Sequence, residues 1–134
     1  MAIVETQTSD IPGVWVSKTR DQLLLSGPNA AKGGPGNAWA AGELLLSALN
    51  SCAAALMLSA AADKGIPLAR VHVASESEKD TAQPDRYARL HVDFTLTGVS
   101  QADADTLLTY FKDNCPIYGS LSRGAPVTVK LHIN

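Results

Sequence analysis

The sequence predicts a single α+β domain over residues 1–134, in which an antiparallel sheet packs on a long buried central helix. Three observations predict this class. Residues 40–62 form one long apolar stretch rich in alanine. Residues 87–97 and 127–134 alternate apolar and polar side chains with the period of two that half-buried strands have. No linker or internal repeat divides the chain.

The elements expected before the long helix are short. Residues 11–16 and 22–26 are apolar segments that predict a hairpin turning at residues 19–21. Residues 27–37 are rich in Gly and Pro and predict a loop over the surface or over a partner subunit. This loop lacks the GxGxxG and phosphate-loop patterns, so we do not expect it to bind a nucleotide.

The long helix is predicted from about Ala40 to Lys64, and Gly65 and Pro67 supply the stop signals. Its length would also span a bilayer. However, much of it is alanine, polar residues fall at its centre, and no basic flank precedes it. We therefore expect a helix buried inside a protein and apolar nearly all round, with no membrane partner.

Strands are expected at residues 71–79, 87–97 and 127–134, giving the order β-β-α-β-β-α-β. Strands with one apolar and one polar face suit an antiparallel sheet packed on helices. A single sheet covers only one side of a helix that is apolar all round. The sequence therefore predicts an obligate, intertwined homodimer in which a second copy covers the other side.

A second helix is predicted from about Gln101 to Asn114. Ser100 is the expected N-cap, and Asp103 three residues later completes a capping box. The Cys115-Pro116 step should end this helix, because a residue before proline is disfavoured in the helical region.

The composition favours a small cytoplasmic protein. Apolar residues make up 46% of the chain and charged residues 18%, which is too apolar for intrinsic disorder. The net charge of −2 gives no electrostatic basis for binding nucleic acid or an acidic membrane. Residues 1–10 have no apolar run, so we expect no signal peptide and reduced cysteines.

Two cysteines, Cys52 and Cys115, are the candidate chemical groups. No histidine lies within four residues of either, so we expect no metal site. Each thiol shares a helical face with apolar residues: Leu45, Leu49 and Leu56 for Cys52, and Leu107 and Phe111 for Cys115. From the residues alone, two interpretations stay open: buried structural cysteines, which pack like small apolar side chains, or a reactive pair.

Neither thiol is expected to gain a low pKa from its own helix. Cys115 lies at the end of a helix, where the helix dipole disfavours a thiolate, and Cys52 lies in the middle of one. A reactive Cys52 needs a cation from another element. Arg20, in the predicted hairpin turn, is the candidate, because a guanidinium stays charged in an apolar pocket.

The segment GELLLSALNSCAAALMLSAAADKGIPLARVHVASESEKD resembles the central region of the OsmC/Ohr family, and NCPIYGSL at 114–121 looks like the family's second Cys-Pro motif. The resemblance covers about residues 10–134. It implies an OsmC-like fold and an intertwined dimer with two active sites at the subunit interface. It further implies a hydroperoxide reductase in which Cys52 is the peroxidatic and Cys115 the resolving cysteine.

The same resemblance assigns supporting roles and partners. Arg20 matches the family's arginine and Glu43 its glutamate. Glu43 precedes Cys52 by nine residues, half a turn out of phase on an ideal helix, so a direct role requires an irregular helix entry. It equally fits a carboxylate in the first helical turn. The implied substrate is an organic hydroperoxide, the implied reductant is an external dithiol of the lipoyl type, and no cofactor is required.

Two other function classes stay open. A non-enzymatic module that binds a small apolar ligand at the dimer interface predicts unreactive thiols. A redox sensor predicts stoichiometric oxidation of Cys52 and Cys115 without turnover.

Overall fold

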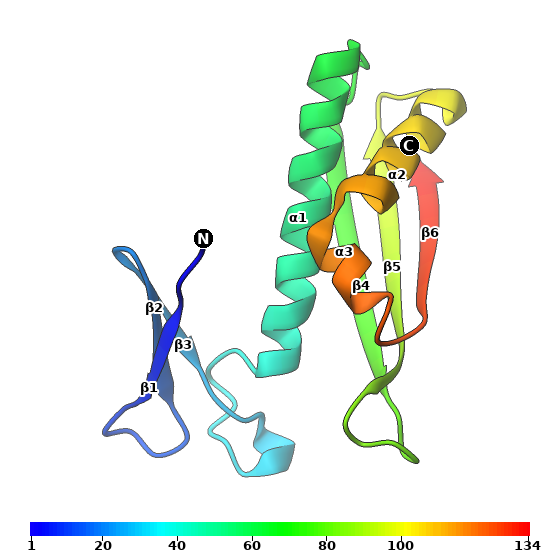
Figure 1. The fold of residues 1–134 in the computed structure, drawn as a ribbon. Helices are drawn as coiled ribbons and strands as arrows, with labels where there is room; N and C mark the ends of the chain where they lie inside the picture. Colours follow the sequence, from blue (N-terminus) through cyan, green and yellow to red (C-terminus); the bar gives the residue numbers. More distant parts are fainter. The chain divides into compact units, whose positions relative to one another are not determined.

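The computed structural model describes residues 1–134 as two compact units, Met1–Leu45 and Leu46–Asn134, and each unit is considered by itself (Figure 1). The architecture is α+β, as predicted, with two three-stranded sheets. The single-domain organisation expected for residues 1–134 stays a prediction.

The first unit is built on an antiparallel sheet in the order β1-β2-β3. Its strands are β1 (Glu5–Thr8), β2 (Trp15–Thr19) and β3 (Gln22–Ser26). The hairpin predicted from the sequence is present as β2 and β3, although its first strand begins at Trp15 rather than at residue 11. Strand β1 was missed because its residues are polar and all exposed, which leaves no apolar alternation to read.

The Gly- and Pro-rich loop after β3 is confirmed, and it contains a short 3-10 helix, η1 (Ala30–Lys32). Asn29 caps this helix by accepting a hydrogen bond from the N–H of Lys32 at 3.1 Å. The loop folds tightly on itself: a Cβ atom at Gly34 would lie 1.7 Å from the carbonyl oxygen of Pro28. Only glycine fits there.

The long helix α1 (Ala41–Lys64) has nearly the bounds that the sequence predicts, and Gly65 follows it in the left-handed conformation, with φ 65°. Its length and composition would also fit a membrane span. In this structure one side of the helix packs in the core of the second unit. The α1 residues buried in the core are Leu49, Ala53, Met57, Ala60 and Ala61.

The second unit contains the sheet β4-β5-β6, formed by β4 (Arg70–Lys79), β5 (Tyr87–Thr97) and β6 (Val127–Ile133). Strands β4 and β5 are antiparallel, whereas β5 and β6 are parallel. The prediction of an antiparallel sheet is therefore wrong for the last strand pair. The chain between β5 and β6 forms helices that cross over one face of the sheet, and such a crossover is the connection that parallel neighbours require.

That crossover consists of α2 (Gln101–Asn114) and a helix the sequence did not predict, α3 (Pro116–Leu121). Helix α2 begins as expected. The Ser100 side chain accepts the N–H of Asp103 at 3.1 Å and donates its hydroxyl proton to the Asp103 carboxylate at 2.8 Å. It also ends as expected before Pro116. Proline is favoured at the first position of a helix, and here it also begins α3.

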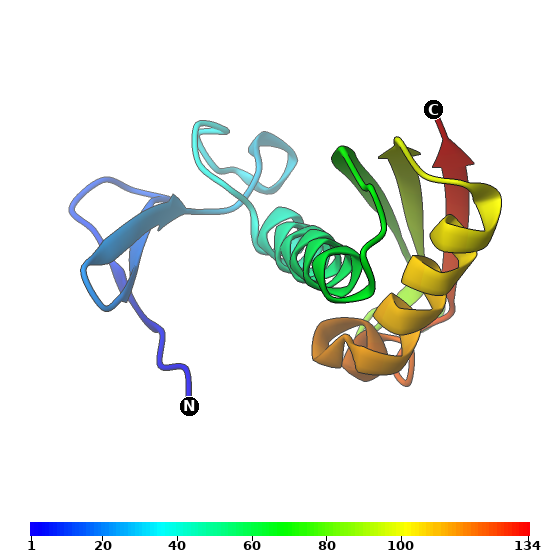
Figure 2. The ribbon, with the colours of Figure 1, turned by 90° about the horizontal axis from the view of Figure 1, so that it is seen from above.

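The core lies between the sheet and the helices, which Figure 2 shows on one face of the β4-β5-β6 sheet. From Leu90 onward, strand β5 alternates buried and partly exposed residues, and its fully buried face consists of Leu90, Val92, Phe94 and Leu96. Phe94 of β5 meets Phe111 of α2 edge to face, with ring centroids 5.1 Å apart, and Phe111 meets Tyr118 of α3 at 5.0 Å. These rings hold α2 and α3 to the sheet.

Replacing Phe111 by alanine should test this core. Phe111 is fully buried, so its loss leaves a cavity and should lower the free energy of unfolding by about 3–5 kcal/mol. Lys112, the exposed neighbour on the same helix, is the matched control, and Lys112→Ala should change stability by less than about 0.5 kcal/mol. Urea denaturation measures both. Equal effects of the two substitutions would contradict this description of the core.

Candidate functional site

The two thiols meet in the second unit, although 63 residues separate them in the sequence. The Sγ atoms of Cys52 and Cys115 lie 2.9 Å apart, and both cysteines are free thiols. Such a contact allows the two sulfurs to form a disulfide with little movement of the chain. The structure thus brings together the two cysteines that the sequence singled out.

Cys52 is positioned by α1. It lies in the middle of the helix, next to the fully buried Ala53 and one turn beyond the fully buried Leu49. Its own side chain is only partly buried. The predicted apolar face of the helix therefore carries this sulfur to the edge of the core rather than into its centre.

Cys115 is positioned by the break between α2 and α3. It ends α2, where its N–H donates to the carbonyl oxygen of Phe111, and it is also the N-cap of α3. Its backbone is extended, with ψ 110°, as expected before a proline. Only 3% of the residue is exposed.

This position corrects one expectation. The sequence placed Cys115 at a helix end, where the dipole disfavours a thiolate. Because α3 begins at once, the Cys115 sulfur also accepts the backbone N–H of Tyr118 at 3.3 Å. A donor of this kind stabilises negative charge on sulfur, so the unfavourable end of α2 is opposed by the start of α3.

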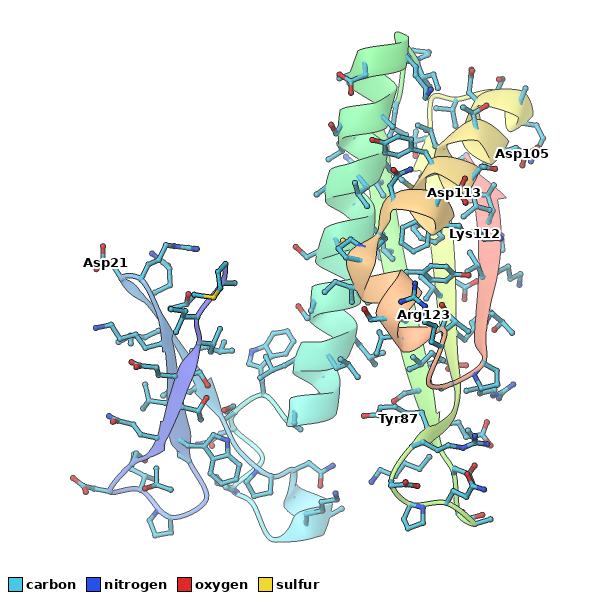
Figure 3. The ribbon with its side chains drawn as sticks, viewed as in Figure 1. Asp21, Tyr87, Asp105, Lys112, Asp113 and Arg123 are labelled. Atoms are coloured by element: carbon cyan, nitrogen blue, oxygen red, sulfur yellow. The ribbon has the colours of Figure 1, made fainter.

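The surroundings of Cys52 work against its ionisation. Burial, followed by the hydrogen bond and the charge of the neighbouring Cys115 sulfur, raises the pKa of Cys52 to about 11. A backbone hydrogen bond from Ile117 acts in the opposite direction. No cation contributes to this shift; Lys112 of α2 and Arg123, which follows α3, are labelled in Figure 3. At neutral pH Cys52 is a thiol in this setting.

Arg20 belongs to the first unit, in the two-residue turn between β2 and β3. The residue is exposed, and its φ of 51° places it in the left-handed region, where a side chain is disfavoured. Arg20 is therefore an exposed residue at the tip of the hairpin. Its approach to Cys52 stays a prediction.

Glu43 also belongs to the first unit and lies in the first turn of α1. Its carboxylate accepts the N–H of Ala40 at 2.8 Å, which is one half of a capping box. This is the first-turn carboxylate that the sequence left open as an alternative. Glu43 also lines an open hollow of about 540 Å³ together with residues 36–39. A catalytic role for Glu43 stays a prediction.

The backbone donors at the sulfurs were missed by sequence reasoning. The N–H groups of Ile117 and Tyr118 carry no side-chain signal, and the only clue was Pro116, which we interpreted as a helix stop rather than a helix start. No group of three or more His, Cys, Asp and Glu side chains is placed to bind a metal ion.

Comparison with known proteins gives a family match. A family model described as OsmC-like protein matches residues 34–130. No curated protein matches the chain in sequence.

Solved structures share the fold at low sequence identity. An OsmC-like protein from Mycoplasma pneumoniae is similar with a TM-score of 0.88 at 12% identity, covering 99% of this chain and 96% of that one. An organic hydroperoxide resistance protein OsmC from Legionella pneumophila gives 0.76 at 20% identity, covering 98% and 96%. The organic hydroperoxide resistance protein OhrB of Bacillus subtilis gives 0.67 at 18% identity, covering 100% and 98%.

The family model covers more than half of the chain and includes both cysteines and the helices that carry them. The chain therefore belongs to the OsmC-like protein family.

Proposed function

We propose that this protein is a thiol-dependent peroxidase that reduces organic hydroperoxides to alcohols. The observation that carries the proposal is the 2.9 Å contact between the sulfurs of Cys52 and Cys115. Two solved structures with the same fold are named organic hydroperoxide resistance proteins, which supports the same chemistry. The reaction uses sulfur alone and needs no cofactor.

In the proposed cycle, the Cys52 thiolate attacks the distal oxygen of the hydroperoxide. The O–O bond breaks, the alcohol leaves after taking a proton, and Cys52 becomes a sulfenic acid. The Cys115 thiol then attacks the Cys52 sulfur, which releases water and forms the disulfide. An external dithiol of the lipoyl type returns both cysteines to thiols.

The cycle requires a group that favours the Cys52 thiolate, because its pKa of about 11 would otherwise leave little of it ionised. We assign this role to Arg20, whose guanidinium also stabilises charge that develops on the peroxide oxygens. Glu43 is proposed to help position this arginine. Cys115 belongs to the hydrophobic core and Cys52 packs against it, and these apolar surroundings favour organic hydroperoxides over hydrogen peroxide.

We further propose that the active form is an intertwined cytoplasmic homodimer with its two sites at the subunit interface. The first unit supports this because its sheet has little core of its own. Three consecutive leucines of β3 are exposed to 69%, 38% and 53%: Leu23, Leu24 and Leu25. On α1, Leu58 is 50% exposed. A second copy of the chain would bury such surfaces.

The 2.9 Å contact between the two sulfurs also fits a second candidate function, that of a redox sensor, because the same disulfide would form on oxidation. A sensor would be oxidised once to the Cys52–Cys115 disulfide and would not turn over with a dithiol. Turnover separates the two candidates.

The peroxidase proposal predicts different outcomes for the two cysteine substitutions. Cys52→Ser should abolish consumption of cumene hydroperoxide in the presence of dihydrolipoamide. Cys115→Ser should still reduce one equivalent of peroxide and should accumulate the Cys52 sulfenic acid, which dimedone traps. Peroxide consumption and intact mass measure these outcomes. Normal turnover by Cys52→Ser would exclude the mechanism, and oxidation of the unmodified protein without turnover would favour the sensor.

The role of Arg20 predicts a pH shift. In the unmodified protein, the alkylation rate of Cys52 should titrate below the ordinary thiol pKa of ~8.5. In Arg20→Gln the pKa should rise toward about 11, since burial then acts without a cation. Because only the thiolate reacts, alkylation at pH 7 should slow by at least about tenfold.

Lys18→Gln is the matched control, since Lys18 is an exposed cation on the same hairpin. It should leave the titration of Cys52 unchanged. Identical titration curves for Arg20→Gln and the unmodified protein would remove Arg20 from the mechanism.

A further inference from the structure

We infer that the reducing dithiol attacks the sulfur of Cys52, and that Cys115 leaves as a thiolate held by the backbone N–H of Tyr118. This inference rests on the proposed function, which it deepens by giving the reduction step a direction. It also assigns Tyr118 a positioning role through its backbone.

Access to the two sulfurs is unequal. Cys52 is partly exposed, whereas Cys115 is 3% exposed and belongs to the hydrophobic core. A thiolate attacks a disulfide sulfur from the side opposite to the leaving sulfur. Core residues surround the Cys115 sulfur, and the fully buried Phe111 lies one turn earlier on α2. They leave an external thiolate no room to approach this sulfur. The partly exposed sulfur of Cys52 is therefore the one that a reductant can reach.

The leaving sulfur also needs a donor. The Cys52 sulfur has the backbone N–H of Ile117 and the Cys115 sulfur has that of Tyr118, so the direction of attack follows from the difference in access. The N–H of Tyr118 donates to the Cys115 sulfur at 3.3 Å. The neighbouring groups of the same turn have other roles: Pro116 has no N–H, the N–H of Ile117 acts on the Cys52 sulfur, and the N–H of Gly119 donates to the carbonyl oxygen of Cys115 at 2.9 Å. A sulfur whose thiolate is stabilised by a hydrogen bond leaves faster.

The Tyr118 side chain keeps this donor in place. Its ring packs against Phe111, with centroids 5.0 Å apart, and Phe111 packs against Phe94 of the sheet. The first turn of α3 is therefore anchored to the core through its own side chain. The N–H of Tyr118 points at Cys115 before any charge develops there, so little reorganisation accompanies the step.

The thiolate of the external dithiol forms a bond to the Cys52 sulfur while the Cys52–Cys115 bond breaks. The electron pair of the broken bond goes to Cys115, which becomes a thiolate and later takes a proton from solvent. The second thiol of the reductant loses its proton and attacks the sulfur of the reductant within the mixed disulfide. It releases Cys52 as a thiolate, and the dithiol is oxidised to its disulfide.

The direction is tested on the disulfide form, prepared with diamide rather than with peroxide. The oxidised protein is treated with excess glutathione, quenched with acid within seconds, and mapped by peptide mass spectrometry. The expected result is glutathione on Cys52 and a free thiol on Cys115. Glutathione mainly on Cys115, an equal mixture, or no adduct at all would each overturn the inference.

The donor is tested by replacing the Tyr118 amide with an ester, which removes the N–H and keeps the side chain. The initial rate of glutathione addition should fall by about three- to tenfold, the effect expected for one hydrogen bond of ordinary strength to a sulfur whose charge is only partly developed. The matched control is the same replacement at Gly119, which removes a helical hydrogen bond of the same turn but no contact with sulfur. Equal slowing by both replacements, or no slowing by the first, would exclude the role of the Tyr118 N–H.

Failure of the inference is distinguishable from failure of the proposed function. Diamide forms the disulfide without any peroxide, so the site of glutathione addition does not depend on peroxidase activity. A protein that turns over peroxide but takes glutathione on Cys115 would keep the proposed function and refute the direction. A protein that is inactive with peroxide but takes glutathione on Cys52 would refute the proposed function and keep the direction of attack.

Discussion

The break between α2 and α3 is the constraint on which the candidate site depends. Pro116 holds the backbone of Cys115 in an extended conformation, so that α2 ends there and α3 begins. In this position the Cys115 sulfur lies 2.9 Å from the Cys52 sulfur. The same proline begins α3, whose first turn supplies the N–H of Tyr118 to the Cys115 sulfur. The contacts between the rings of Phe94, Phe111 and Tyr118 fix both helices to the sheet. The place of the Cys115 sulfur, the backbone N–H that contacts it and the packing of α3 therefore all depend on the break at Pro116.

Burial brings the sulfurs together and also suppresses their reactivity. The surroundings that let Cys52 touch Cys115 raise the pKa of Cys52 to about 11, since the neutral thiol is favoured away from water. The second unit by itself is thus suited to form and hold a disulfide and poorly suited to attack a peroxide. Our proposal resolves this conflict by taking the cation from Arg20 of the first unit. The unfavourable backbone conformation of Arg20 is consistent with a side chain retained for function.

Much of the second unit was predictable from the sequence, and less of the first. Helix α1, strand β5 and helix α2 follow from strong periodicity and clear end signals such as Gly65, Ser100 and Pro116. Strand β1 has no apolar pattern, and the parallel pairing of β6 depends on a crossover that local patterns do not reveal. The two thiols could be identified as candidates, yet their contact depends on α3, which the sequence presented only as a helix stop. Backbone donors such as the N–H of Tyr118 cannot be recognised from residue types, because nearly every residue has such a group.

The central claim is that Cys52 and Cys115 are the two ends of one redox reaction. The most direct test is the intact mass and non-reducing peptide map of the protein after one equivalent of cumene hydroperoxide. The account predicts a protein lighter by two hydrogen atoms, with the peptides of Cys52 and Cys115 joined by a disulfide. A protein that gains one oxygen on Cys52 while Cys115 stays a free thiol, or that does not react, would contradict it.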